Sequence, residues 1–115
     1  MEDKELYAGL IRLHILYHAA QEPIFGLAII EELGRHGYRL SPGTLYPLLH
    51  ALEAKGQLRS LVQSRDGRRR RMYRATARGR RSLEAAKGKV RELFSELFEE
   101  LRPARRLGVA ASRRL

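Results

Sequence analysis

The most informative segment of the chain is LSPGTLYPLLHALE, residues 40–53. Ser41 is a favoured helix N-cap, and Pro42 suits the first helical position because its missing N–H would be unpaired there in any case. An apolar stripe at helical spacing follows, made of Leu45, Leu48, Leu49 and Leu52. The segment therefore predicts a helix over residues 41–55, closed by Gly56.

The opposite face of this predicted helix is small, polar and flat near its N-terminal end. Its members are Gly43, Thr44, Tyr46, Pro47 and His50. Such a face suits close approach to a nucleic-acid groove, and a helix N-terminus attracts phosphate. Thr44 and Tyr46 have polar groups able to reach a phosphate or a base edge; the alternative is a solvated helix face. Pro47 removes one helical hydrogen bond, which is tolerable near the helix start and away from the core.

A β-hairpin is expected next, with strands over residues 58–64 and 69–75. Asp66-Gly67 is a strong turn signal between them. Four consecutive arginines, Arg68 to Arg71, follow that turn. Because successive side chains of a strand point to opposite faces, about half of these arginines can face one partner at once. A basic hairpin directly after a compact helix pair is typical of the wing of a winged helix-turn-helix.

Three further helices are expected, over residues 3–20, 24–35 and 77–102. The last has an apolar seam at steps of three and four residues, as in a short coiled coil. We expect this seam to pair two copies of the chain through Leu83, Val90, Leu93, Leu97 and Leu101. The fold class is thus mainly α with a small β-hairpin. A winged helix-turn-helix DNA-binding domain is expected over residues 1–76, then the dimerisation helix, then a basic, disordered tail over residues 103–115.

The positive charge of the chain is concentrated. The net charge of the 115 residues is +10 at pH 7. Residues 59–81 contain ten arginines and one aspartate, and residues 102–115 contain five arginines and no acid. Arginine makes forked contacts to phosphate and guanine, so a concentrated block of it indicates a polyanion partner. The alternative is a solubilising surface.

Composition also narrows the classes of function and location. The chain has no cysteine, no convincing acid pair, no phosphate-cradling glycine motif and no triad spacing, so we do not expect an enzyme. The lack of cysteine fits a reducing cytoplasm. No apolar run approaches the length of a membrane span, so no membrane partner is expected.

Two sets of side chains are candidates for a second site. Tyr7, Tyr17, Phe94 and Phe98 could line an apolar cavity between subunits, although core and seam packing is the favoured interpretation. His14 and His18 stand four residues apart on the first helix, a spacing that can hold a metal ion. No acid or cysteine obviously converges on this pair, so packing histidines at the dimer contact are favoured. No metal and no cofactor are expected.

The stretch LSPGTLYPLLHALE, residues 40–53, resembles the recognition-helix signature of the PadR family of transcriptional regulators. The stretch GRRRRMYRATARG, residues 67–79, resembles that family's wing and the entry to its last helix. The resemblance covers roughly residues 5–101, and the single C-terminal helix is similar to the family's short subfamily.

The resemblance implies a winged helix-turn-helix repressor that dimerises through its C-terminal helix and responds to a small aromatic ligand or drug. It places the recognition-helix residues Ser41, Gly43, Thr44, Tyr46 and His50 at double-stranded DNA. It places Arg68, Arg69, Arg70 and Arg71 on the DNA backbone or in the minor groove. Leu27-Ala28 departs from the family's aromatic–acidic pair, and the wing is more basic than the pattern requires.

The sequence therefore predicts a sequence-specific DNA-binding transcriptional regulator, acting as a homodimer on an inverted repeat. Two alternatives remain open. A non-sequence-specific nucleic-acid-binding protein would share the charge but prefer no operator. A protein-interaction module would use the apolar first helix and the seam to bind a different protein.

Overall fold

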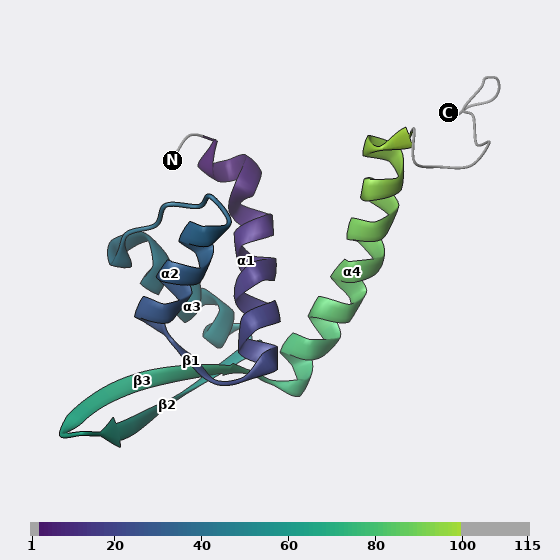
Figure 1. Ribbon diagram of the computed structural model, residues 1–115. Coiled ribbons are helices and arrows are strands. Elements are labelled where there is room, and N and C mark those ends of the chain that lie inside the picture. Colours follow the sequence, from purple (N-terminus) through teal and green to yellow (C-terminus); the bar gives the residue numbers. More distant parts are fainter. Residues whose placement is uncertain (1–2, 100–115) are drawn as a thin grey trace, which may run out of the picture. The chain divides into compact units, whose positions relative to one another are not determined.

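The computed structural model describes residues 3–99, which form four helices and three strands (Figure 1). In chain order these elements are α1 (Lys4–Gln21), β1 (Ile24–Phe25), α2 (Gly26–Arg35), α3 (Pro42–Ala54), β2 (Leu58–Arg65), β3 (Arg68–Ala75) and α4 (Ala77–Leu97). The chain divides into two compact units, the first ending at Glu84 and the second beginning at Ala85. None of the helices described here has the length and apolar character needed to cross a membrane.

The predicted helices and hairpin are confirmed, with one addition. The sheet has three antiparallel strands in the order β1-β3-β2, because residues 24 and 25 pair with β3 through Ile24–Tyr73 and Phe25–Met72. Phe25, which falls inside the helix expected over residues 24–35, therefore lies in a short strand and is half-buried. Pairing with β3 gives hydrogen-bond partners to backbone groups in the segment just before α2, which would otherwise have none.

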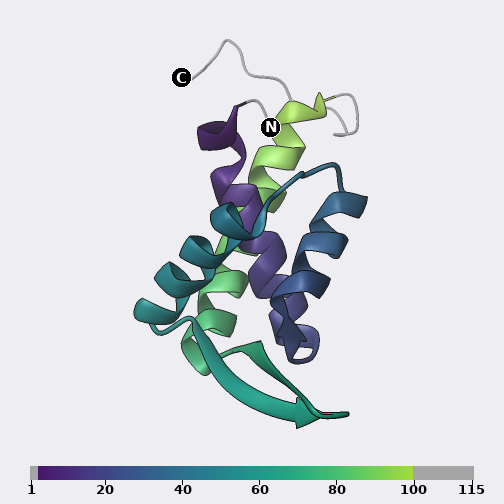
Figure 2. The ribbon, with the colours of Figure 1, turned by 90° about the vertical axis from the view of Figure 1, so that its left-hand side faces the viewer.

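The β2–β3 hairpin projects beyond the helices of the first unit (Figures 1 and 2). Its register runs from Leu58–Ala75 at the base to Arg65–Arg68 at the tip. Asp66 and Gly67 close it with positive φ angles of 54° and 74°, the left-handed backbone that this two-residue turn requires. The Asp-Gly turn signal is therefore confirmed.

The core of the first unit contains buried side chains from each of its elements except β1, whose Ile24 packs against the core half-buried. Its fully buried side chains are Ile15 from α1, Ile29 and Leu33 from α2, Leu45 and Leu49 from α3, Leu58 from β2 and Tyr73 from β3. The predicted leucine stripe of α3 thus faces inward, with Leu48 half-buried at its margin. The opposite face of α3 remains available to a partner.

The first turns of α4 are tied to the turn between α3 and β2. Thr76 N–H donates to the carbonyl of Gln57 at 3.1 Å, and Gly79 N–H donates to Thr76 Oγ1 at 3.0 Å. Leu83, which we assigned to the dimer seam, is instead buried in the core of the first unit at 9% exposure. This corrects the assignment, since a buried side chain cannot also cover a second copy.

Candidate nucleic-acid interface

The N-terminal end of α3 presents the polar face that the sequence predicts. Thr44 N–H donates to Ser41 Oγ at 3.3 Å, so Ser41 is the N-cap. Ser41, Gly43 and His50 are exposed, while Thr44 is half-buried. The exposed helix start carries the positive end of the helix dipole, which attracts phosphate.

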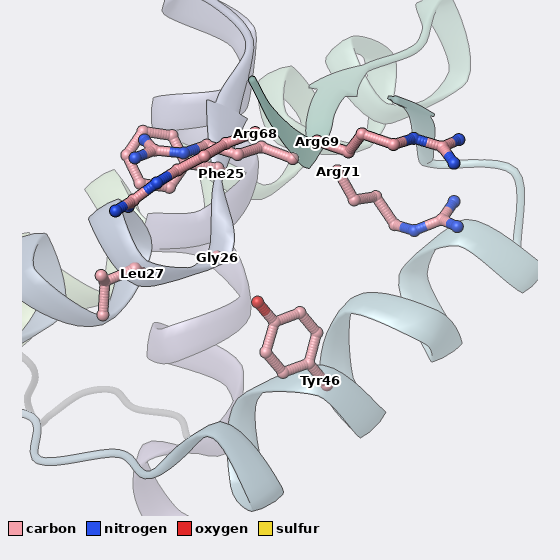
Figure 3. Close-up of a pocket in the computed structure, with 8 residues that line it drawn as sticks. Phe25, Gly26, Leu27, Tyr46, Arg68, Arg69 and Arg71 are labelled. Atoms are coloured by element: carbon pink, nitrogen blue, oxygen red, sulfur yellow. The ribbon is translucent and has the colours of Figure 1, made fainter. Parts of the chain in front are cut away.

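The sequence predicted Tyr46 on the outer polar face of α3, but its side chain does not lie freely there. Its ring is half-buried against the core, and its hydroxyl points toward α2 (Figure 3). A Cβ atom added at Gly26 would lie only 2.2 Å from Tyr46 Oη. Because Gly26 has no side chain, the Tyr46 ring fits between α2 and α3. Tyr46 therefore packs between these two helices and is also a candidate contact to DNA.

The four arginines that follow the hairpin turn are all exposed. They are the first four residues of β3, and their long side chains all reach the groove described below. Arg70 lies over the ring of Phe25, with its guanidinium carbon 4.5 Å from the ring centroid. Arg71 Nη1 donates to Ser60 Oγ at 3.1 Å, and that hydroxyl donates to Glu53 Oε2 at 2.8 Å. Two of the four guanidinium groups are therefore held in place before any ligand binds.

These elements enclose an open groove of about 530 Å³. It is lined by Phe25, Gly26, Leu27, Tyr46, Arg68, Arg69, Arg70 and Arg71 (Figure 3). The start of α2 and the ring of Tyr46 form its apolar side, and the arginines supply the charge. A groove of this kind can accept an extended anion that lies between the helix pair and the hairpin.

Sequence reasoning missed the contribution of residues 25–27 to this groove. A two-residue strand has no periodicity of its own, and its position depends on pairing with a strand far along the chain. The one available signal was Gly26, because a residue without a side chain permits close approach of another group. The structure shows that the approaching group is the side chain of Tyr46.

The structure also gathers side chains that could hold a metal ion. His14, His18 and His36 place ligand atoms within 4.8 Å of one another. Glu32 Oε2 lies 3.7 Å from His18 Nε2 and 3.3 Å from His36 Nε2. The premise that no acid converges on His14 and His18 is therefore wrong, because the end of α2 supplies one.

The candidate seam residues that are described in the second unit are exposed in the single chain. Val90, Leu93 and Leu97 are 44%, 54% and 65% exposed. Leu101 and the tail over residues 103–115 lie outside the described residues.

The candidate effector residues fall in different parts of the chain. In the second unit, Phe94 and Phe98 contact each other with ring centroids 4.8 Å apart. In the first unit, Tyr7 is half-buried edge-on against Tyr38, and Tyr17 is 47% exposed beside His18. None of the four lines the groove.

Comparison with known proteins gives one consistent answer. The model of the transcriptional regulator PadR-like family matches residues 15–85. The transcriptional regulator Rv3488 of Mycobacterium tuberculosis is 50% identical over 95 residues, which cover 83% of this chain and 89% of that protein.

Solved structures agree with this match. A PadR family transcriptional regulator from Eggerthella lenta has a TM-score of 0.72 and 30% identity, covering 86% of this chain and 88% of that one. A PadR-like transcriptional regulator from Bacillus cereus has a TM-score of 0.77 and 25% identity, covering 85% of this chain and 97% of that one. The winged helix-turn-helix fold is therefore confirmed, and the chain belongs to the PadR-like family of transcriptional regulators.

Proposed function

We propose that the chain represses transcription in the cytoplasm by binding, as a homodimer, to an inverted-repeat operator in double-stranded DNA. The observation that carries the proposal is the groove between Tyr46 and the arginines of β3, next to the capped start of α3. This geometry would place α3 in a major groove, with the wing arginines on adjacent phosphates.

The proposed contacts are of two kinds: those that would recognise the base sequence and those that would bind the DNA backbone. Four residues of α3 and its N-cap are at least partly exposed and could approach base edges or phosphates: Ser41, Gly43, Thr44 and His50. Tyr46 would contribute its hydroxyl at the groove while keeping α2 and α3 apart. The exposed arginines Arg68 to Arg71 would bind backbone or the minor groove, contributing affinity more than sequence preference.

Dimerisation is proposed through the exposed apolar residues of α4 and the residue that follows it. Val90, Leu93, Phe94, Leu97 and Phe98 are each between 42% and 65% exposed. Apolar residues this exposed at steps of three and four are typical of a helix that pairs with a second copy. Two recognition helices would then meet half-sites about one helical turn apart, or a multiple of that spacing.

A small aromatic effector that releases the DNA is the last part of the proposal. Tyr7, Tyr17, Phe94 and Phe98 are its candidate contacts, and packing explains Tyr7 and the Phe94–Phe98 pair equally well. A ligand could release DNA only by binding one arrangement of the dimer more tightly than the other.

Selection from a pool of random duplexes, followed by sequencing of the retained fraction, tests the proposal. Enrichment of one inverted repeat supports it. Retention of duplexes without a shared motif favours the alternative of a non-sequence-specific nucleic-acid-binding protein. No retention at all would favour a protein-interaction module.

A further inference from the structure

We propose that His14, His18, His36 and Glu32 form a binding site for a divalent transition metal ion of the zinc class. The site shares no residue with the groove. It does not depend on the proposed mode of DNA binding.

The arrangement consists of two pairs, each with four-residue spacing, on two helices that contact each other. His14 and His18 come from α1, while Glu32 lies near the end of α2 and His36 is the C-cap of that helix. A spacing of four places both members of a pair on one helix face. The two faces meet, so that the imidazoles of His14 and His36 stack with centroids 4.5 Å apart.

The distances are close to those of a coordination sphere. Bonds of about 2.0–2.1 Å in a tetrahedral zinc site separate the ligand atoms by about 3.3 Å. His36 Nε2 already lies 3.3 Å from Glu32 Oε2, and His18 Nε2 lies 3.7 Å from that same oxygen. The three histidines need to approach by no more than about 1.5 Å from their largest separation of 4.8 Å. Side-chain rotations can supply such a movement.

The donor set and its surroundings suit a metal better than they suit simple packing. Three imidazoles and a carboxylate form a ligand set that zinc and similar ions prefer. His18 Nε2 is buried without a hydrogen-bond partner. A buried polar atom in this state needs a partner, and a metal ion would be one.

Neighbouring groups affect the protonation of His14 and the orientation of the Glu32 carboxylate. Burial lowers the pKa of His14, and His36 and His18 lower it further while Glu32 opposes them, which favours the neutral imidazole. Metals bind the neutral form of imidazole. Arg35 Nη1 donates to Glu32 Oε1, which leaves Oε2 directed at the histidines. Arg35 is thus an outer partner that orients a ligand.

A metal at this position would join α1 to the end of α2, the first helix of the helix-turn-helix. Binding to the folded state alone stabilises that state. At a Zn²⁺ concentration about 100 times the dissociation constant, the Tm should rise by roughly 10 °C.

The experiment uses tag-free full-length protein, treated with a chelator and dialysed, and titrated with ZnCl₂ by calorimetry. We expect one Zn²⁺ per chain. His36→Asn and Glu32→Gln should each weaken binding by at least about tenfold, as loss of a ligand must cost no less than loss of an outer partner. His36 is exposed, so its replacement should leave the circular dichroism spectrum unchanged.

His50→Asn is the matched control, because it removes the remaining histidine of the chain outside the cluster. Wild-type protein loaded with Co²⁺ should show the strong visible bands of tetrahedral cobalt, and His36→Asn should lose them. The proposal is overturned if wild type takes up no Zn²⁺ above the buffer blank. It is equally overturned if His36→Asn binds as tightly as wild type, or if His50→Asn loses as much affinity as the cluster variants.

Discussion

Gly79→Ala is the substitution whose cost can be worked out most directly from the structure. The added Cβ would lie 2.1 Å from the carbonyl oxygen of Gln57 and 3.0 Å from its carbonyl carbon. The obstacle is backbone, so it cannot rotate away as a side chain can. The start of α4 must instead retreat by about 1 Å from the α3–β2 turn.

That retreat would strain two hydrogen bonds that hold α4 in place. Thr76 N–H donates to Gln57 O at 3.1 Å, and Gln57 Nε2 donates to Ser82 Oγ at 3.0 Å. Overpacking costs about 1–3 kcal/mol and each strained hydrogen bond about 1 kcal/mol, while replacing glycine in a helix returns about 1 kcal/mol. We expect a net loss of about 2–4 kcal/mol in the free energy of unfolding.

The matched control is Gly88→Ala in the same helix, where nothing lies within 4 Å of an added Cβ. It should gain up to about 1 kcal/mol from helix propensity alone. Urea and thermal unfolding at one fixed protein concentration would measure both variants. The Tm should fall by roughly 8–16 °C for Gly79→Ala and rise slightly for Gly88→Ala. A Gly79→Ala protein as stable as Gly88→Ala would refute the close packing of α4 on the turn.

The other expected outcomes concern the groove and the dimer. Gly26→Ala should displace the Tyr46 ring and destabilise the protein by about 1–3 kcal/mol. Adding Tyr46→Ala should recover part of that loss, so additive effects in a double-mutant cycle of unfolding would contradict the contact. Arg69→Gln with Arg70→Gln should flatten the dependence of operator affinity on salt by roughly 0.9 for each phosphate that is no longer neutralised, as measured by fluorescence anisotropy. Lys89→Gln on α4 is the control, and an equal change there would argue against the wing. Leu93→Asp should raise the dimer dissociation constant by at least about tenfold in analytical ultracentrifugation, because it buries a charge in the seam. An unchanged constant would place the dimer contact elsewhere.

The parts of the fold that the sequence predicted well depend on local signals. The Ser41-Pro42 start of α3 and the Asp66-Gly67 turn each follow from backbone geometry within a few residues. The structure confirms both. The leucine stripe of α3 was predictable for the same reason, since a period of 3.6 residues already defines the buried face.

The features that escaped prediction depend on contacts between distant segments. β1 exists only because it pairs with β3, and Tyr46 leaves the outer face only because Gly26 lacks a side chain. Leu83 fits a coiled-coil seam by spacing, yet the first turns of α4 bury it in the core. The histidine cluster needs the end of α2 beside α1, and helical spacing within one segment cannot reveal that arrangement.

The measurement that tests the central claim most directly is a titration of one operator against its scrambled counterpart. The operator would be the inverted repeat recovered by selection, and the control duplex would have the same length and base composition. At physiological salt the operator should bind at least about 10³ times more tightly, the lower end of the range for specific regulators. Equal affinity for the two duplexes would mean that the α3 surface and the arginines recognise charge alone.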